Sequence, residues 1–395
     1  MKTLLKINPD TWKNASRDKR DLSAAMEAGF DVAVVAKGEK GDKMRLGETE
    51  GFPVYFCDTR PLPRLSVKVN RVLAALQWIW YISKTDADVL NCHDLKALEM
   101  GYLATRLMPK KKRPMLLYDA HEFEIGRNTD GRRGKFAAWF VQHAEKFLMK
   151  RADLSVMVND SIADETAKIH GLETKPLVIR NICNNWQLDE TAIAAARKAF
   201  LQELNMPEDT FIVMYHGGLM PARGIEQLIE VVAINDRIAL VVLGNGPDAY
   251  VSSLRKQVEQ KQIAERVLFH PAVPHGELWK YVGAADVGMV VLQNVCMNHY
   301  YTLPNKYFEN VQSLTPVICS NFPEVSKLTT EYGIGLVCDS ADIQDINAKI
   351  EKMRTDKEFY ESCKQNLLKA KEELCWEREK EKLVSAYEQM MQKLS

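Results

Sequence analysis

The stretch that decides the fold is FIVMYHGGLMPARGIEQLIEVV, residues 211–232. It opens with five apolar residues, which predict a buried strand, and after Gly224 the apolar residues recur at helical spacing. Gly217 and Gly218 stand between the two patterns and permit a tight turn. A strand, a turn and a helix in this order are typical of a βα unit on a parallel sheet.

The same alternation runs along the whole chain. In the first half we expect strands at residues 4–7, 31–36, 54–57, 89–92, 115–118, 154–158 and 177–179. In the second half the further strands are expected at residues 239–243, 267–270, 287–292, 316–319 and 335–338. The tail, residues 342–394, has the pattern of helices only.

We therefore predict an α/β protein with two Rossmann-like domains and C-terminal helices. The expected bounds are residues 1–185, 186–372 and a last helix, 373–395, that packs back toward the N-terminal domain. A length of 395 residues exceeds what one hydrophobic core usually supports. Ligands of such folds bind at the carboxyl ends of strands, here expected along a central cleft that the two domains face.

The composition excludes few classes of protein. Formal net charge is zero, so nothing in the total charge favours nucleic acid. The eight cysteines form no CxxC pair and no zinc spacing, and we expect them to be small buried apolar residues in a reducing compartment. Because the first seven residues are too charged for a signal peptide, we expect a cytoplasmic chain.

Two segments have a composition that is found in membrane-contacting proteins. Residues 106–151 hold twelve Lys or Arg against five Asp or Glu. Residues 72–82, which include Trp78 and Trp80, are apolar but too short to span a bilayer. The ordinary interpretations are a solvated loop for the first segment and a buried or half-buried helix for the second. The alternatives are contact of the basic stretch with an anionic membrane or lipid phosphate, and docking of the tryptophans at the interface.

The glycine turn at residues 217–218 predicts an anion site. Arg223 lies at the start of the following helix, where free backbone N–H groups already favour negative charge. Its guanidinium adds a bidentate donor for phosphate. The alternative is a glycine turn with a surface arginine. The GxGxxG fingerprint is absent from residues 8–15, after the first strand, which argues against an NAD-dependent dehydrogenase.

A second candidate is TLPNKYFE, residues 302–309, which opens a semi-buried helix. Burial of the Glu309 carboxylate is costly unless hydrogen bonds satisfy it. Two vicinal ribose hydroxyls would do so, as an acid does in Rossmann-like sites. A salt bridge to a lysine or arginine is the alternative.

A third candidate is YDAHE, residues 118–122, directly after a strand. It places Asp119, His121 and Glu122 together, and an aspartate can fix the tautomer of a histidine and raise its basicity. A second set of zinc-like ligands is missing, so no metal site is predicted. A structural histidine is the alternative, and NCHD at 91–94 is a weaker version of the same pattern.

Taken together, these stretches resemble the family 4 (group 1) glycosyltransferases of the GT-B fold. The similar segments, in order, are RDKR 17–20 with AGFDV 28–32, YDAHE 118–122, VIRN 178–181, residues 215–229, GNGP 244–247, ADVG 285–288, LPNKYFE 303–309 with Pro316, and Trp376 with Glu377. Their shared order and spacing over nearly the whole chain carry the resemblance.

The resemblance implies a donor site for a nucleotide sugar. Its residues would be Gly217, Gly218, Arg223, Gly244, Asn305, Lys306 and Glu309. Among them Arg223 and the paired glycines would hold the diphosphate, and Glu309 the ribose. His121 and Asp119 would be the catalytic pair that faces the acceptor. Retention of anomeric configuration is expected without a metal ion or a cofactor, because fixed positive groups neutralise the leaving diphosphate.

The function implied is a hexosyltransferase-like enzyme that uses a UDP- or GDP-linked sugar and a saccharide or lipid-linked acceptor. Such an enzyme would serve bacterial surface polysaccharide or glycolipid synthesis, in the cytoplasm or at the inner face of the membrane. Two departures from the family pattern are Tyr301, in place of a glutamate, and Gly218, in place of an arginine. They motivate the alternative of a non-catalytic partner-binding protein, and a nucleotide-sugar epimerase on the same fold is another alternative.

Overall fold

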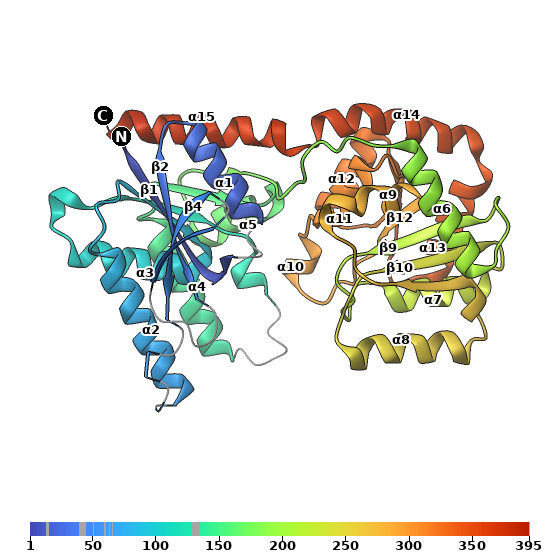
Figure 1. Ribbon diagram of the computed structural model, residues 1–395, viewed down its shortest axis with the longest axis horizontal. Coiled ribbons are helices and arrows are strands. Elements are labelled where there is room, and N and C mark those ends of the chain that lie inside the picture. The colour runs from blue at the N-terminus through green and yellow to red at the C-terminus, as the bar shows by residue number, and fades with distance from the viewer. Residues whose placement is uncertain are drawn as a thin grey trace. The chain divides into compact units, whose positions relative to one another are not determined.

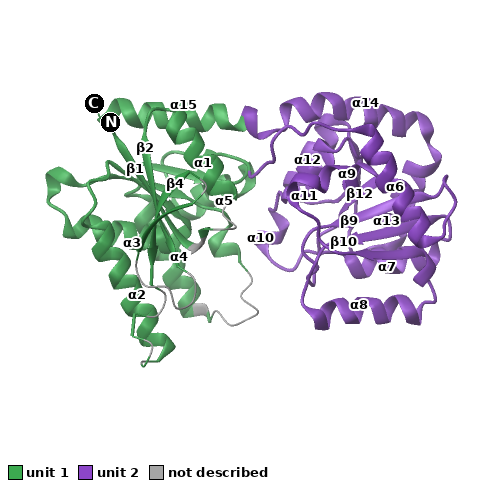
Figure 2. Ribbon diagram, viewed as in Figure 1, with its two compact units in different colours: residues 1–180, 379–395 green, residues 181–378 purple. Residues whose placement is uncertain are grey.

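The computed structural model describes residues 1–12, 16–38, 45–49, 51–58, 61–62, 64, 66–127 and 134–394. The chain divides into two compact units, residues 1–180 with 379–395 and residues 181–378 (Figure 2). Each unit consists of a largely parallel sheet with helices packed against it (Figure 1). This architecture confirms the predicted α/β class and its two parallel sheets.

In the described part of the first unit, eight strands form a sheet in the order β3-β4-β2-β1-β5-β6-β7-β8. The strands are β1 Thr3–Thr11, β2 Asp31–Lys37, β3 Arg45–Thr49, β4 Phe52–Cys57, β5 Val89–His93, β6 Met115–Asp119, β7 Leu154–Met157 and β8 Leu177–Val178. Strand β1 pairs in parallel with both β2 and β5, so its side chains Leu4 and Ile7 lie in the middle of the core.

The helices of the first unit cover this sheet. They are α1 Ser16–Glu27, α2 Val67–Ile82, α3 Asp94–Leu107, α4 Lys135–Met149, α5 Asp160–His170 and most of α15 Trp376–Leu394. Helix α15 brings the end of the chain back to its beginning, and the ring of Tyr387 packs edge-on against Phe30 at 6.0 Å. Tyr387 is fully buried there.

In the second unit, six strands form a parallel sheet in the order β11-β10-β9-β12-β13-β14. The strands are β9 Phe211–His216, β10 Ile238–Leu243, β11 Val267–His270, β12 Val287–Val290, β13 Val317–Ser320 and β14 Gly335–Cys338. The helices are α6 Glu190–Leu204, α7 Ile225–Ile234, α8 Asp248–Gln260, α9 Leu278–Gly283, α10 Met297–Tyr300, α11 Asn305–Gln312, α12 Pro323–Tyr332, α13 Ile343–Thr355 and α14 Lys357–Glu373. All six residues of β10 are buried, as expected for a strand covered on both faces.

Two expectations need correction. Strand β3 was not predicted, because the sequence RLGET has no apolar run and the strand is an exposed antiparallel partner of β4. Trp78 is buried while Trp80 is 53% exposed, so docking at an interface through both tryptophans is wrong. Two residues along a helix turn the side chain by more than half a circle, which separates the two indoles.

Two other observations bear on the environment of the chain. Seven of the eight cysteines are buried and Cys296 is half-buried, as predicted for small apolar residues. Among the residues that the structure describes, no helix combines the length and the apolar character that crossing a bilayer requires.

Candidate functional site

The loops after β9 and β10 lie against each other. Gly217 has φ 115° and Gly244 has φ 152°, both in the region that favours glycine. A Cβ on Gly244 would stand 1.9 Å from the carbonyl oxygen of Gly217, and one on Gly246 would stand 2.1 Å from that of Leu219. The backbone N–H of Gly217 donates to the Leu243 carbonyl at 2.9 Å. Glycine is therefore required where these two loops meet.

Arg223 lies at the end of the first of these loops, one residue before the helix cap. Gly224 caps α7 with φ 83°, so the arginine stands beside the free N–H groups of the helix start. The side chain is half-buried, and no acidic residue of the described chain pairs with it. Burial lowers the pKa of His299, and the charge of Arg223 lowers it further. Arg223 thus retains an uncompensated positive charge.

Lys306 is a second basic side chain beside the glycine turn. Its side chain is 7% exposed, and its Nζ lies 3.6 Å from the centre of the Tyr215 ring. Within the described residues that nitrogen has no hydrogen-bond partner. The Lys306 Cε lies 3.7 Å from where a Cβ of Gly217 would stand, so the lysine lies along the glycine turn. Burial lowers the pKa of Lys306 well below its ordinary value, and the charge of Arg223 lowers it further, while the charge of Glu309 acts in the opposite direction.

Glu309 lies one turn further along α11 and is held by imidazoles. His216 Nε2 lies 3.0 Å from Glu309 Oε2, and His275 Nε2 lies 3.4 Å from Oε1. Burial raises the pKa of this carboxyl, but hydrogen bonds from the two histidines outweigh burial and bring the pKa to about 2. A pair with lysine or arginine, the alternative considered from the sequence, is not what the structure shows for Glu309.

The remaining predicted donor residues lie next to those already described, in the sequence or in the two loops. Gly218 is exposed in the glycine turn, and Asn305 is exposed as the first residue of α11. Beside Gly244 a cavity of about 430 Å³ is lined by the ends of β10 and β11, including Phe269 and His270. We name Arg223, Lys306, Glu309 and the glycines of the two loops the donor-loop cluster.

The first unit holds a separate cluster around a buried lysine. Lys6 is fully buried on β1, and its Nζ lies 2.8 Å from Asp119, 2.9 Å from Asp21 and 3.1 Å from Asp18. It also donates to Asn91 at 3.0 Å. Burial works against the ammonium charge, but the three carboxylates raise the pKa of Lys6 well above its ordinary value. This cation is fully compensated.

The predicted pair Asp119 and His121 belongs to this cluster. His121 Nε2 lies 3.0 Å from Asp119 Oδ2, while Arg17 donates to the other carboxylate oxygen at 2.8 Å. Burial raises the pKa of Asp119, but Lys6 and Arg17 outweigh it and hold that pKa well below its ordinary value. Burial, followed by the charge of Arg17, lowers the pKa of His121. Both pKa shifts favour a neutral imidazole beside an ionised carboxylate.

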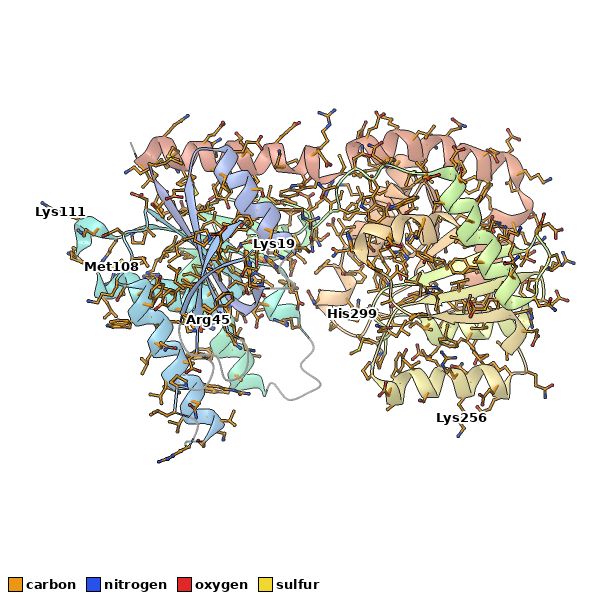
Figure 3. The ribbon with its side chains drawn as sticks, viewed as in Figure 1. Lys19, Arg45, Met108, Lys111, Lys256 and His299 are labelled. Atoms are coloured by element: carbon orange, nitrogen blue, oxygen red, sulfur yellow. The ribbon has the colours of Figure 1, made fainter. Side chains whose placement is uncertain are left out.

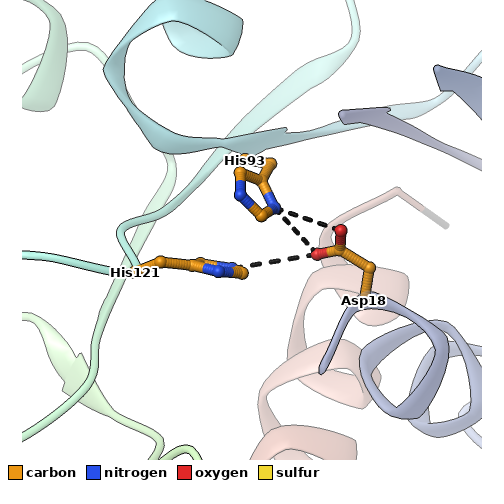
Figure 4. A group of neighbouring side chains, drawn as sticks. All are labelled: Asp18, His93 and His121. Atoms are coloured by element: carbon orange, nitrogen blue, oxygen red, sulfur yellow. Dashed lines mark hydrogen bonds and ion pairs between the residues drawn. The ribbon is translucent and has the colours of Figure 1, made fainter. Parts of the chain in front are cut away.

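His93 joins the same cluster, as Figure 4 shows. Its Nδ1 lies 3.0 Å from Asp18 Oδ1, and its ring centre lies 3.7 Å from that of His121. Burial lowers the pKa of His93, but its hydrogen bond to Asp18 and the charges of Asp18 and Asp94 together outweigh burial and raise the pKa. We name Lys6, Arg17, Asp18, Asp21, Asn91, His93, Asp119 and His121 the acid–imidazole cluster.

Glu122 does not join the acid–imidazole cluster, although this residue directly follows His121 in the sequence. Its carboxylate lies 2.9 Å from Arg127 Nε, and its side chain is 45% exposed. The sequence pattern expected an acid, an imidazole and a second acid together. The structure instead supplies the further acids from α1, as Asp18 and Asp21.

Asp18, His93 and His121 each offer a ligand atom, and these atoms lie within 4.8 Å of one another. However, the Lys6 ammonium already lies 3.1 Å from Asp18 Oδ1. A divalent cation would meet that like charge at close range. The arrangement is better suited to hydrogen bonds with hydroxyl groups, for which carboxylates and imidazoles offer acceptors and donors.

Two family models match consecutive segments of the chain. Residues 196–370 match the family described as glycosyl transferases group 1, and residues 19–181 match the glycosyl transferase 4-like domain. A D-inositol 3-phosphate glycosyltransferase of Xylanimonas cellulosilytica is 31% identical over 104 residues, which are 26% of this chain. The matched segment covers 25% of the length of this relative.

Solved structures share the fold over nearly the whole chain. A sucrose-phosphate synthase of Thermosynechococcus elongatus has a TM-score of 0.76 at 17% identity, with 99% of this chain and 100% of that chain covered. Anabaena HepE in complex with UDP-glucose has a TM-score of 0.74 at 14% identity, with 99% of each chain covered. A UDP-forming trehalose-phosphate synthase of Burkholderia vietnamiensis has a TM-score of 0.71 at 11% identity, with 100% and 98% covered.

The two family matches follow one another along the sequence, one in each compact unit. Together with the shared fold they settle the class of this protein. The chain belongs to the group 1 glycosyltransferases of the GT-B fold.

Proposed function

We propose that the protein transfers a hexosyl group from a nucleoside diphosphate sugar to a saccharide or lipid-linked acceptor, with retention of anomeric configuration. The observation that carries the proposal is the Lys306 ammonium, which is buried, lacks a hydrogen-bond partner and lies beside a glycine turn. Because a buried unpaired charge is costly, a pyrophosphate is the natural partner of Lys306 and Arg223.

The donor nucleotide would extend along the donor-loop cluster. The cavity beside Gly244 would take the base, since its lining combines backbone groups of the loop with the ring of Phe269. Ribose hydroxyls would displace His275, whose side chain is 63% exposed, from the Glu309 carboxylate. Exposed Asn305, at the start of α11, would lie beside phosphate or sugar. A UDP-linked donor is supported by the fold shared with Anabaena HepE, whose structure is that of a complex with UDP-glucose. A GDP-linked donor is the other candidate.

The acid–imidazole cluster would serve the acceptor. Neutral His121, oriented by Asp119, would accept a hydrogen bond from the attacking hydroxyl. In the transfer, the bond between the sugar anomeric carbon and the diphosphate oxygen breaks and a bond to the acceptor oxygen forms. The acceptor proton would pass to the His121 imidazole, and the negative charge that develops on the diphosphate would be stabilised by Arg223 and Lys306.

The biological setting is part of the same proposal. Synthesis of a bacterial surface polysaccharide or glycolipid at the cytoplasmic face of a membrane would suit a transferase with a basic first unit. The excess of lysine and arginine in residues 106–151 supports this setting. Within that stretch, residues 128–133 lie outside the described residues.

Thermal-shift screening against UDP-, GDP-, ADP- and CMP-linked compounds tests the proposal, because a ligand of the native state raises its melting temperature. We expect one class to stabilise the parent and to lose this effect in Arg223→Ala. Arg237→Ala, which removes an exposed arginine of the same unit, is the matched control. An epimer formed without acceptor would indicate an epimerase instead. Indifference to every nucleotide, with a co-purifying partner, would indicate a non-catalytic protein.

A further inference from the structure

We propose that the exposed apolar faces of α2, α3 and α4 form a docking surface for an anionic lipid bilayer. We name this surface the α2–α4 face and define it by Val72, Leu76, Trp80, Leu107, Trp139 and Phe140. It lies wholly in the first unit and uses no residue of either candidate site. Helix α3 packs against both α2 and α4, so the three helices form one continuous layer (Figure 1).

The first turns of helix α4 carry the sequence FAAWF, residues 136–140, and all five residues are exposed. Phe136 is 78% exposed, Trp139 52% and Phe140 59%. The rings of Phe136 and Trp139 stack on each other at 6.0 Å rather than against the core. An exposed run of apolar and aromatic residues of this length is unfavourable in water unless it is an interaction site.

Helix α2 continues the surface. Val72, Leu76 and Trp80 are 60%, 56% and 53% exposed, and they follow one another at intervals of four residues. This interval places them on one side of the helix. On α3, Leu103 and Leu107 are 49% and 65% exposed. Each of the three helices thus presents a stripe of apolar side chains away from the core of the unit.

Between α3 and α4 the surface is hollowed. A cavity of about 490 Å³ is lined mainly by Tyr102, Leu103, Trp139, Phe140 and Phe147, and Glu99 is the one acidic residue among the described residues of its lining. Most of the lining is apolar, so an apolar group that entered the cavity would leave water.

Positive charges border the apolar stripes. The Arg151 guanidinium lies 3.5 Å from the centre of the Phe147 ring, and that of Arg106 lies 5.8 Å from the centre of the Tyr102 ring. Helix α2 carries Lys68 and Arg71 and has no acidic residue. Lys111 extends away from the ribbon at the edge of the unit (Figure 3). Apolar side chains bordered by cations match a bilayer, where the former enter the hydrocarbon boundary and the latter meet anionic headgroups.

The charges also decide between a bilayer and a second copy of the chain. A symmetric dimer through this face would bring Arg106, Arg151 and the lysines at 110–112 toward their own copies. Like charges placed together at an interface are unfavourable by several kcal/mol. The α2–α4 face therefore fits an anionic surface better than it fits itself.

Co-sedimentation of the full chain with phosphatidylcholine vesicles, with and without about 30% phosphatidylglycerol, tests the proposal. We expect binding to the anionic vesicles alone, weakened by salt. Trp139→Ser with Phe140→Ser should lower partitioning at least about tenfold, because both side chains are withdrawn from the bilayer. Leu368→Ser on α14, where the leucine is 49% exposed, is the matched apolar control and should bind like the parent.

A second pair of variants tests the charge. Arg106→Glu with Arg151→Glu should abolish most of the binding, whereas Lys256→Glu on exposed α8 (Figure 3) should change it little. Circular dichroism and the nucleotide thermal shift of each variant should match the parent, which separates this test from the proposed transfer. The proposal is overturned if the Trp139 and Phe140 variant binds like the parent, or if neutral vesicles bind as well as anionic ones. A dimer that dissociates in that variant, without lipid binding, would also overturn it.

Discussion

Two buried lysines of this chain have opposite surroundings. The Lys6 ammonium lies within 3.1 Å of three carboxylates, while Lys306 Nζ has only the face of Tyr215 among the described residues. Burial lowers the pKa of Lys306, whereas at Lys6 the three carboxylates outweigh burial and raise the pKa. The first lysine is neutralised within its own unit, whereas we assign the pyrophosphate of the donor as the partner of the second.

Methionine substitutions of the two lysines should therefore have opposite effects on stability. Lys6→Met leaves three buried carboxylates without their cation and should lower the free energy of unfolding by about 3–5 kcal/mol. Lys306→Met removes an unpaired buried charge, so the ligand-free protein should be as stable as the parent or more stable. Urea unfolding of both variants gives these values. A large loss of stability in Lys306→Met would show that an interaction within the protein satisfies this lysine.

The pKa of Glu309 predicts a pH dependence of stability. Its folded value of about 2 lies below its ordinary value of 4.5, so the stabilisation is present above pH 4.5 and is lost as pH falls toward 2. The lost contribution is at most about 3 kcal/mol. Glu309→Gln should flatten this part of the curve of unfolding free energy against pH. Glu331→Gln, in an exposed pair of α12, is the control and should keep the parent curve. Identical curves for all three proteins would contradict the assignment.

At the scale of elements, the donor-loop cluster depends on contact between two strand-end loops. Gly244→Ala would place a methyl group 1.9 Å from the Gly217 carbonyl oxygen, at a φ that disfavours alanine. We expect a loss of about 2–4 kcal/mol in unfolding free energy and loss of nucleotide binding. Gly276→Ala is the control, since a Cβ there meets nothing within 4 Å. If both variants were equally stable, the contact between the loops would not be required.

Helix α15 reaches the acid–imidazole cluster through one hydroxyl. Tyr387 donates to Asp21 and accepts from Asn91 at 2.8 Å, and both of these residues contact Lys6. Tyr387→Phe should cost about 1–3 kcal/mol in unfolding free energy, because buried polar groups lose a partner. It should also shift the pH profile of transfer, since Lys6 contacts Asp119. Tyr332→Phe, which removes a surface hydrogen bond to Glu373, is the control. Equal effects of the two variants would contradict this linkage.

Much of the element pattern could be predicted from the sequence, for a physical reason. Parallel strands buried on both faces are apolar runs, and the strands at 267–270 and 335–338 occur at the residues predicted. Strand β3 is exposed and carries no such run, so its pairing with β4 had no signal in its own residues.

The candidate sites were predictable only in part. Motifs after strands indicated Arg223, Glu309 and the Asp119–His121 pair. The partners of these residues come from distant segments, such as Lys6, which is 113 positions from Asp119, and His275 beside Glu309. Spacing within one segment carries no information on such contacts, which is also why Glu122 was wrongly grouped with His121.

At the scale of the whole molecule, a net charge of zero conceals three different arrangements of charge. The acid–imidazole cluster pairs its cations with carboxylates inside the first unit. The α2–α4 face carries cations on the outside of the same unit. The donor-loop cluster of the second unit holds Arg223 and Lys306, and the Lys306 amine has no hydrogen-bond partner among the described residues. Composition reports their sum, and only the structure separates them.

The most direct measurement of the central claim is a calorimetric titration that compares nucleoside diphosphates with the corresponding nucleosides. The parent should bind UDP or GDP far more tightly than uridine or guanosine, because charge-assisted hydrogen bonds to the pyrophosphate are strong. The double variant Arg223→Ala with Lys306→Met should lose at least about 100-fold in affinity for the diphosphate and little for the nucleoside. Diphosphate affinity in this variant equal to that of the parent would contradict the account.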